Sequence, residues 1–249
     1  MSSLMAVATA SLIIPAALYS TVDVSKEEGF SLVLNLSRGT SVVLLILYVL
    51  YLVFQLHTHS DFFDAELQSE DQENTSQQDS NEQDTPILTV IESGVVLVAV
   101  TLAVAVCAEY LVGSIDSVVG SSGISKTFIG LILIPIVGNA AEHVTAVVVA
   151  MKNKMDLAIG VAIGSSMQIA LLVTPALVIL GWIIGQPMSL YFQTFETVVF
   201  FMSVLITNYL IQDGKSNYLE GAMLLGIYTI IGISFYVYPD SAGNSGPPY

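Results

Sequence analysis

The chain has few charged residues. Of its 249 residues, 11% are charged and six are Lys or Arg, while 54% are hydrophobic. A soluble globular domain carries about a quarter charged residues, so this composition excludes that class and indicates a polytopic membrane protein. The six basic residues form no cluster, which argues against nucleic acid and anionic headgroups as partners.

The chain also lacks a second cysteine. A single cysteine, Cys107, excludes an intrachain disulfide and a thiolate metal cluster. Because Cys107 lies in an apolar segment, we expect a buried, inert thiol. Basic residues are missing ahead of the first apolar run, which Pro15 interrupts, so we expect a membrane helix there and not a cleaved signal.

Several apolar segments approach the length of about 20 residues that crosses a bilayer. A polar connection over residues 21–37 separates the first two, and most other connections are short and contain glycine or proline. We therefore predict an all-α polytopic membrane protein with about seven transmembrane helices. Their approximate ranges are 3–19, 40–56, 87–112, 128–151, 157–180, 190–211 and 218–237.

An acidic segment at residues 59–86 divides the chain. It holds nine of the 21 acidic residues and has too few apolar residues to offset the entropy of ordering. We expect a disordered linker there, between two helices in residues 1–58 and five in residues 87–238, and a disordered tail in residues 239–249. The linker is either a plain solvated connection or an acidic antechamber that raises the local cation concentration.

One apolar segment carries polar residues in its middle. On a helix, Asn139, Glu142 and His143 project from one face, because they are three and four residues apart. A carboxylate at mid-membrane is costly, so function is the default hypothesis. The alternative is a packing motif in which Asn139 holds a protonated Glu142. Pro135 lacks an amide hydrogen, so we predict a bend there with a free carbonyl.

A second polar cluster, Gly164-Ser165-Ser166-Met167-Gln168, lies in the middle of the next segment. Ser165 and Gln168 share a helix face through their three-residue spacing. Such groups also serve as hydrogen-bonding contacts between membrane helices, and that alternative stays open.

The oxygen atoms of the two clusters suit a hard cation. Calcium takes about six to eight oxygen ligands and tolerates irregular geometry, whereas zinc prefers nitrogen and sulfur and would find His143 alone. Calcium is therefore favoured, and sodium or manganese could use the same atoms. The candidate ligands are the carboxylate of Glu142, the amide oxygens of Asn139 and Gln168, the hydroxyls of Ser165 or Ser166, and backbone carbonyls near Pro135 and Gly138.

These residues resemble a known family. The run Gly138-Asn139-Ala140-Ala141-Glu142-His143 is similar to the second signature motif of the calcium/proton exchangers, within the wider cation/calcium antiporter superfamily. The resemblance covers nearly the whole chain and points to the vacuolar exchangers of fungi and plants. It continues in residues 108–115, 151–156 and 164–169.

The resemblance implies a calcium/proton antiporter that loads calcium into the vacuole against the proton gradient. Such a protein is a multi-pass carrier of the vacuolar membrane, or of another acidic compartment, and not an enzyme. It needs no cofactor, because calcium and protons are its cargo. Burial favours a protonated Glu142 while the site is empty, and a bound cation drives that proton off, so this residue would hold one or the other. His143 and Glu109 are candidates for the proton pathway, Glu109 together with Asp116 near a mouth.

The chain departs from the family in one respect. The exchangers it resembles have two inverted halves, each with a Gly-Asn-x-x-Glu-type helix, and this chain has one such helix. The resemblance thus implies an N-terminally truncated carrier that holds two helices of the first half and the five of the second. A single glutamate under-neutralises calcium, so we expect inefficient exchange without the missing N-terminal half or a second copy.

Two other classes of function stay open. A non-transporting regulatory or partner subunit would keep the helices and lack exchange. An intramembrane hydrolase would need a different spacing, since the adjacent Glu142 and His143 do not form a His-Glu-x-x-His motif. The remaining membrane-edge acids, Glu92, Glu196 and Glu220, are interpreted as structural.

Overall fold

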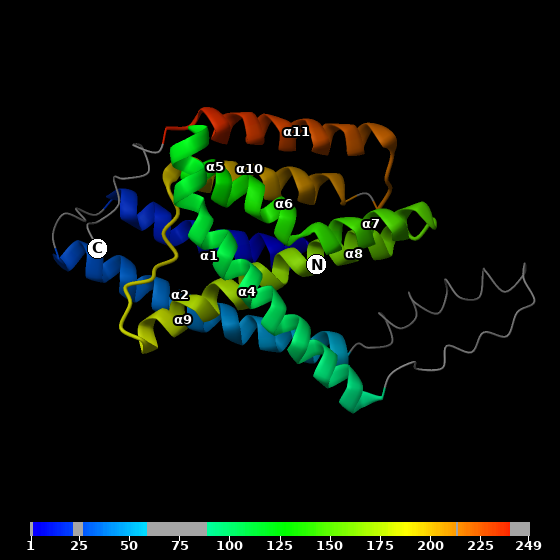
Figure 1. Cartoon of the computed structure of the whole chain (residues 1–249), viewed down its shortest axis with the longest axis horizontal. Helices are drawn as coiled ribbons and strands as arrows, with labels where there is room; N and C mark the ends of the chain where they lie inside the picture. The colour runs from blue at the N-terminus through cyan, green and yellow to red at the C-terminus, as the bar shows by residue number, and fades with distance from the viewer. Residues whose placement is uncertain (1, 22–26, 59–88, 213, 240–249) are drawn as a thin grey trace, which may run out of the picture.

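The computed structural model describes residues 2–21, 27–58, 89–212 and 214–239, and these residues form helices with no strand. The predicted all-α class is confirmed for this part, and the predicted linker at 59–86 lies outside it. The elements (Figure 1), with η for a π-helical turn, are α1 (Ser2–Thr21), α2 (Glu27–Val53), η1 (Phe54–Thr58), α4 (Val90–Ser122), α5 (Lys126–Phe128), η2 (Ile129–Leu133), α6 (Ile134–Gly138), α7 (Ala140–Met151), α8 (Met155–Gln168), η3 (Ile169–Val173), α9 (Thr174–Ile183), α10 (Thr194–Leu210) and α11 (Tyr218–Val237).

Five of the described helices are long and apolar enough to cross a membrane. A sixth span is formed if the bent pair Lys126–Gly138 and Ala140–Met151 is counted as one. The segment predicted at residues 190–211 contains helix α10. With 17 residues, α10 is one residue shorter than the 18 required of a candidate span. The predicted count of seven is therefore not confirmed, although each predicted segment contains helix.

The polar connection predicted over residues 21–37 is wrong for most of its length, because α2 already begins at Glu27. Ser37 and Ser41 donate hydrogen bonds of 2.8 Å to carbonyls four residues earlier in the same helix. The guanidinium of Arg38 lies 5.0 Å from the ring centroid of Trp182 on α9. The two serine hydroxyls thus find acceptors within α2, and the guanidinium lies over an aromatic ring, without a break in the helix.

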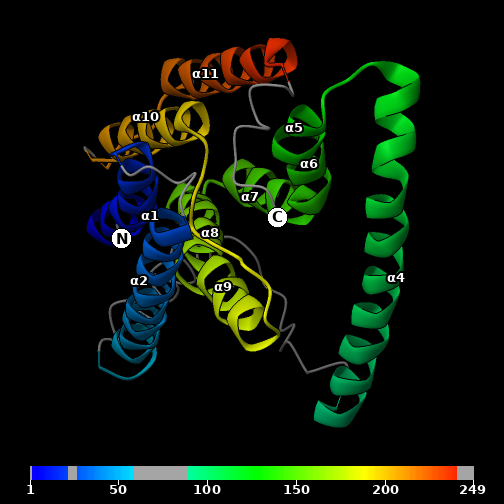
Figure 2. The same cartoon turned by 90° about the vertical axis from the view of Figure 1, so that its left-hand side faces the viewer.

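Helix α4 runs ten residues beyond its predicted end at residue 112. Gly113 continues the helix, whereas Gly123 ends it with a left-handed backbone at φ 69°. No residue of α4 is buried, and Figure 2 shows the helix standing at the edge of the bundle. Cys107 is exposed on α4, so the predicted burial of this thiol is wrong.

The packed core joins helices from both sides of the acidic segment. Helix α2 packs along α9, and α1 packs against α8 and α10. Figures 1 and 2 both show α10 and α11 side by side above this core. The buried cluster consists of Met5, Ala8, Leu12, Leu44, Ile163, Met167, Leu171, Val178 and Leu190.

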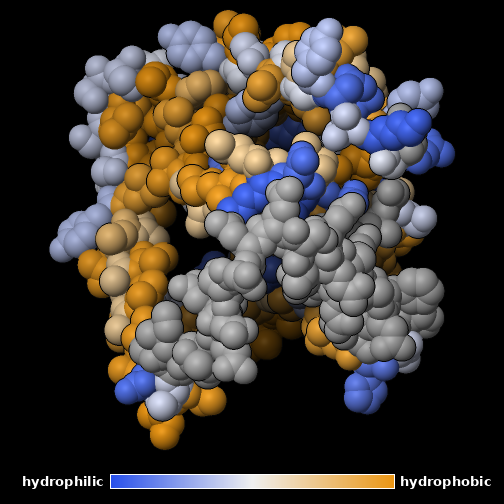
Figure 3. Space-filling view, turned by 90° about the vertical axis from the view of Figure 1, so that its right-hand side faces the viewer, coloured by the Kyte–Doolittle hydropathy of each residue, from blue (hydrophilic) through white to orange (hydrophobic). Residues whose placement is uncertain are grey.

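Large hydrophobic side chains remain on the outside of the bundle. They cover much of the face shown in Figure 3, and Leu97 on α4, for example, is 68% exposed. An apolar surface of this extent is expected where lipid tails and not water surround the helices.

Gly181 provides a test of the packing at the end of α9. It is buried, and a Cβ added there would lie 2.8 Å from the Cβ of Met188. Because Met188 Cβ is fixed to the backbone, we expect Gly181→Ala to lower stability by about 1–3 kcal/mol and to reduce the melting temperature in detergent. Gly160→Ala is the control, since no atom lies within 4 Å of its added Cβ. Equal melting temperatures for both variants would contradict this packing.

Candidate functional site

The two helical segments that carry the predicted polar clusters, residues 126–151 and 155–183, each contain a π-helical turn just before a proline. Pro135 follows η2, and Pro175 follows η3, each by two residues. In η2 the amide of Ile134 donates to the carbonyl of Ile129, five residues earlier, and in η3 Thr174 donates to Ile169. The wider turn accommodates a residue that cannot donate to the carbonyl four positions before it.

The sharp bend lies at Asn139. The axes before and after this residue differ by 51°, and its backbone has φ −97° and ψ 16°. The predicted bend at Pro135 is therefore wrong by four residues, because the π turn absorbs the proline. Asn139 stays tied to both sides, since its N–H donates to the Pro135 carbonyl at 2.9 Å and its carbonyl accepts from His143 N–H at 3.0 Å.

A cavity of about 590 Å³ opens beside this bend. Asn139 lines it, together with Ser165 and Ser166 of α8. Two helices thus bring three of the predicted ligands to one space. The other polar residues that line the cavity are Thr174, Glu196, Thr197, Ser203 and Tyr228.

The remaining predicted site residues do not line the cavity. Glu142 is half-buried on α7, one turn beyond Asn139, and His143 and Gln168 are exposed. Gly138 is also exposed, with no atom within 4 Å of an added Cβ. Glu142 is therefore close to the cavity in sequence but is not part of its wall.

Glu109 and Asp116, which were predicted to lie near the mouth of the ion pathway, are on α4 at the outside of the bundle. Glu109 is exposed there. Asp116 forms an ion pair with Lys126, and both side chains are more than half exposed. The carboxylate of Asp116 thus already has a basic partner.

The cavity serines present lone pairs rather than hydrogens. Ser165 Oγ and Ser166 Oγ donate to the carbonyl of Ala162 at 3.3 and 2.9 Å, within their own helix. A hydroxyl whose hydrogen is used in this way keeps its lone pairs for a cation. In the described part of the chain, no three His, Cys, Asp or Glu residues come together. Neutral oxygens would therefore supply most ligands, which suits calcium better than zinc.

Glu196 is the residue that the sequence interpretation missed. It was interpreted as structural at a membrane edge, but it is half-buried and lines the cavity with Asn139. Ser203, seven residues further along α10, lines the same cavity. That seven-residue spacing places both side chains on one face of α10, but it does not connect this face with Asn139, so the sequence alone could not assign Glu196 to the site.

More than half of the chain matches a known protein family. Residues 92–237 match the family model described as sodium/calcium exchanger protein. The chain belongs to the sodium/calcium exchanger protein family. The match includes nearly all of α4 and continues to the end of α11, so the bend and most of the cavity lie inside the family region.

Relatives in this family extend the similarity across the chain. The vacuolar calcium ion transporter of Schizosaccharomyces pombe is 50% identical over 96% of this chain and 55% of its own length. The Ca(2+)/H(+) antiporter of Aphanothece halophytica is 44% identical over 96% of this chain and 64% of its own length. The chain therefore spans between about half and two thirds of these relatives, and the predicted resemblance to the calcium/proton exchangers is confirmed.

A solved structure supports the same relationship. Native YfkE superposes with a TM-score of 0.73 and 34% identity, over 95% of this chain and 62% of that protein. A second structure of YfkE, described as a Ca2+/H+ antiporter protein, gives a TM-score of 0.72. The helices of this chain are thus arranged as in YfkE.

Proposed function

We propose that the chain carries the cation-binding elements of one half of a calcium/proton antiporter. The observation that carries this proposal is the shared cavity, in which Asn139 at the bend meets Ser165 and Ser166 of the next helix. The names of the relatives support calcium as the cargo and protons as the counter-ion. The protein would then be a carrier and not an enzyme.

In this proposal Glu142 holds a proton or a calcium ion, one at a time. The side chain of Glu142 is half-buried one turn beyond Asn139, and a divalent cation bound next to a carboxylate favours the ionised form of that carboxylate. The oxygens of Asn139, Ser165 and Ser166 complete the ligand set, and Gln168 and the backbone near Gly138 contribute when the helices rearrange. His143, next to Glu142, and Glu109 on α4 serve the proton pathway.

The same proposal includes a location and a partner. The relatives named vacuolar support a vacuolar membrane, or another acidic compartment. The chain has one Gly-Asn-x-x-Glu helix, so efficient exchange would require a second carboxylate-bearing helix from an N-terminal half or from a second copy. A regulatory subunit, or a carrier of sodium or manganese, is the alternative.

The test uses a carrier in which this chain replaces the matching region of the Schizosaccharomyces pombe transporter. We expect vesicles that are acidic inside to accumulate radioactive calcium, and a protonophore to stop the accumulation. Excess manganese or sodium should compete less well than unlabelled calcium. Calcium uptake that is equal with and without the proton gradient would contradict the proposal.

A further inference from the structure

One face of α10 forms a wall of the cavity. Glu196, Val199, Phe200 and Ser203 all line it, and their spacing of three, four and seven residues places them on one side of the helix. Among the described residues that line the cavity, Glu196 alone carries a formal charge. The α10 wall thus adds a carboxylate that the Asn139 and serine group lacks.

The position of Glu196 is fixed by the end of α11. The amide of Gln193 donates to Glu196 Oε2 at 3.1 Å, and the Tyr238 hydroxyl donates to Gln193 Oε1 at 3.0 Å. The ring of Phe195 stacks on Tyr238 with centroids 5.1 Å apart. The first turn of α10 is therefore held in place while Glu196 lines the cavity.

The carboxylate of Glu196 is stabilised by the N-terminus of α10 and by one hydrogen bond, but by no cation among the described residues. Within the described residues Glu196 forms no ion pair, and its Oε1 receives no hydrogen bond. A half-buried carboxylate without a cationic partner is costly, and a cation in the cavity would offset that cost.

The neighbouring hydroxyls favour a cation as well. Thr197 Oγ1 donates to the Gln193 carbonyl at 2.9 Å, and Ser203 Oγ donates to the Val199 carbonyl at 2.7 Å. Both hydroxyls donate their hydrogens to backbone carbonyls, as Ser165 and Ser166 do, and their lone pairs remain available to a cation. The oxygens around Glu196 are therefore arranged as acceptors, which suits a hard divalent cation and not an anion.

We propose that Glu196 is a second cation-binding carboxylate of this cavity, which holds the divalent cation against the α10 wall with Thr197 and Ser203. The inference rests on the proposed function, because it assigns a further residue to the same cargo. The negative charge of Glu196 would attract calcium to the cavity that Asn139, Ser165 and Ser166 line. Glu196 would therefore bind the ion in addition to Glu142.

The test measures equilibrium binding of radioactive calcium to the purified chain in lipid nanodiscs. We expect Glu196→Gln to weaken binding about tenfold, and Glu196→Asp to weaken it less. Glutamine still serves as an acceptor at this helix position, so the cap of α10 is kept. Glu220→Gln is the matched control, because Glu220 occupies the same third position in a capping box on α11 and does not line the cavity. It should bind as the unsubstituted chain does.

A second readout separates binding from structure. A hydrophobic carbodiimide modifies protonated carboxyl groups, and mass spectrometry locates the modified residue. Calcium should protect Glu196 from modification and leave Glu220 unprotected. Equal weakening by Glu196→Gln and Glu220→Gln, or no protection of Glu196, would overturn the inference.

The outcomes distinguish this inference from the proposed function. If Glu142→Gln weakens calcium binding and Glu196→Gln does not, the role of Glu196 is wrong and the proposed function stands. If Glu196→Gln weakens binding and Glu142→Gln does not, Glu196 is supported and the role of Glu142 is wrong. An unsubstituted chain that neither binds calcium nor shows protection of Glu196 would overturn both.

Discussion

Glu142→Gln is expected to abolish proton-driven calcium uptake by a carrier that contains this chain. Glutamine keeps the size of the side chain but can neither release a proton nor neutralise a calcium ion. A loss of both roles should reduce the initial rate of uptake at least about 100-fold, equivalent to about 2.7 kcal/mol. The rate is measured with radioactive calcium in vesicles that are acidic inside, using the chimera with the Schizosaccharomyces pombe transporter.

Two further variants make this result interpretable. Glu220→Gln removes a half-buried glutamate of α11 that does not line the cavity, and it should retain the full rate. Glu142→Asp keeps the charge on a shorter side chain and should retain part of it. Uptake by Glu142→Gln at the unsubstituted rate would show that another group couples calcium to protons.

The second large effect is expected for Asn139→Leu. The substitution removes an amide oxygen from the cavity wall at the bend and puts an apolar side chain in its place. We expect the calcium concentration for half-maximal uptake to rise at least about tenfold, because losing a cavity-lining ligand oxygen that leucine cannot replace costs about 1.4 kcal/mol or more. The measurement is the calcium dependence of the initial rate.

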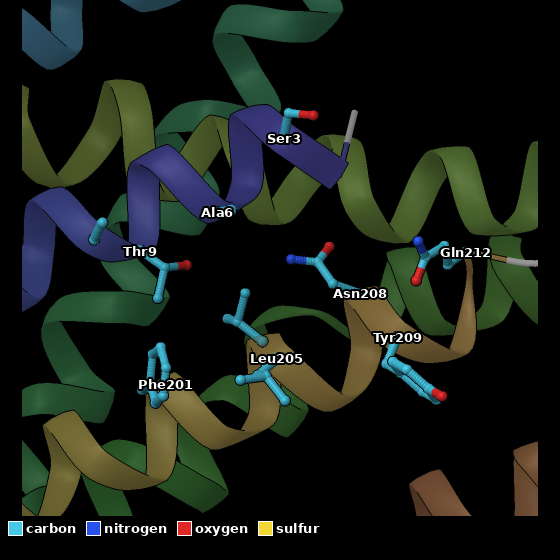
Figure 4. Close-up of a pocket in the computed structure, with 10 residues that line it drawn as sticks. Ser3, Ala6, Thr9, Phe201, Leu205, Asn208, Tyr209 and Gln212 are labelled. Carbon is cyan, nitrogen blue, oxygen red and sulfur yellow. The ribbon is translucent and has the colours of Figure 1, made fainter.

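A matched control for this variant lies in a separate cavity of about 450 Å³ between α1 and α10. Figure 4 shows the amide of Asn208, on α10, directed toward α1 and the side of the cavity that Thr9 and Ser3 line. Asn208 Oδ1 is buried with no hydrogen-bond partner among the described residues. Asn208→Leu should therefore leave the folding stability unchanged or raise it, and it should leave the calcium dependence of uptake unchanged. An equal shift in calcium dependence for both variants would mean that Asn139 acts through packing and not as a ligand.

Part of the site could be predicted from local spacing. The separation of Asn139 from Glu142, and the cluster at residues 164–168, identified the two polar helices, because an ionisable or amide group in an apolar run is rare enough to be informative. The structure brings Asn139 to the same cavity as Ser165 and Ser166.

The rest depended on tertiary structure. The bend moved from Pro135 to Asn139 because a π turn absorbed the proline, and no simple sequence rule indicates such a turn. Helix α2 continues through polar residues that were interpreted as a connection, because Ser37 and Ser41 donate hydrogen bonds to carbonyls of their own helix. Glu196 was missed because its partner helices are distant in the sequence, so position along α10 alone could not show that it lines the cavity.

The central claim is that Glu142 carries either a proton or a calcium ion. The direct measurement is the number of protons released when calcium binds to the chain in nanodiscs, obtained by calorimetry in buffers with different ionisation enthalpies. We predict proton release by the unsubstituted chain, and a clearly smaller release by Glu142→Gln. The same release from both proteins would contradict the claim.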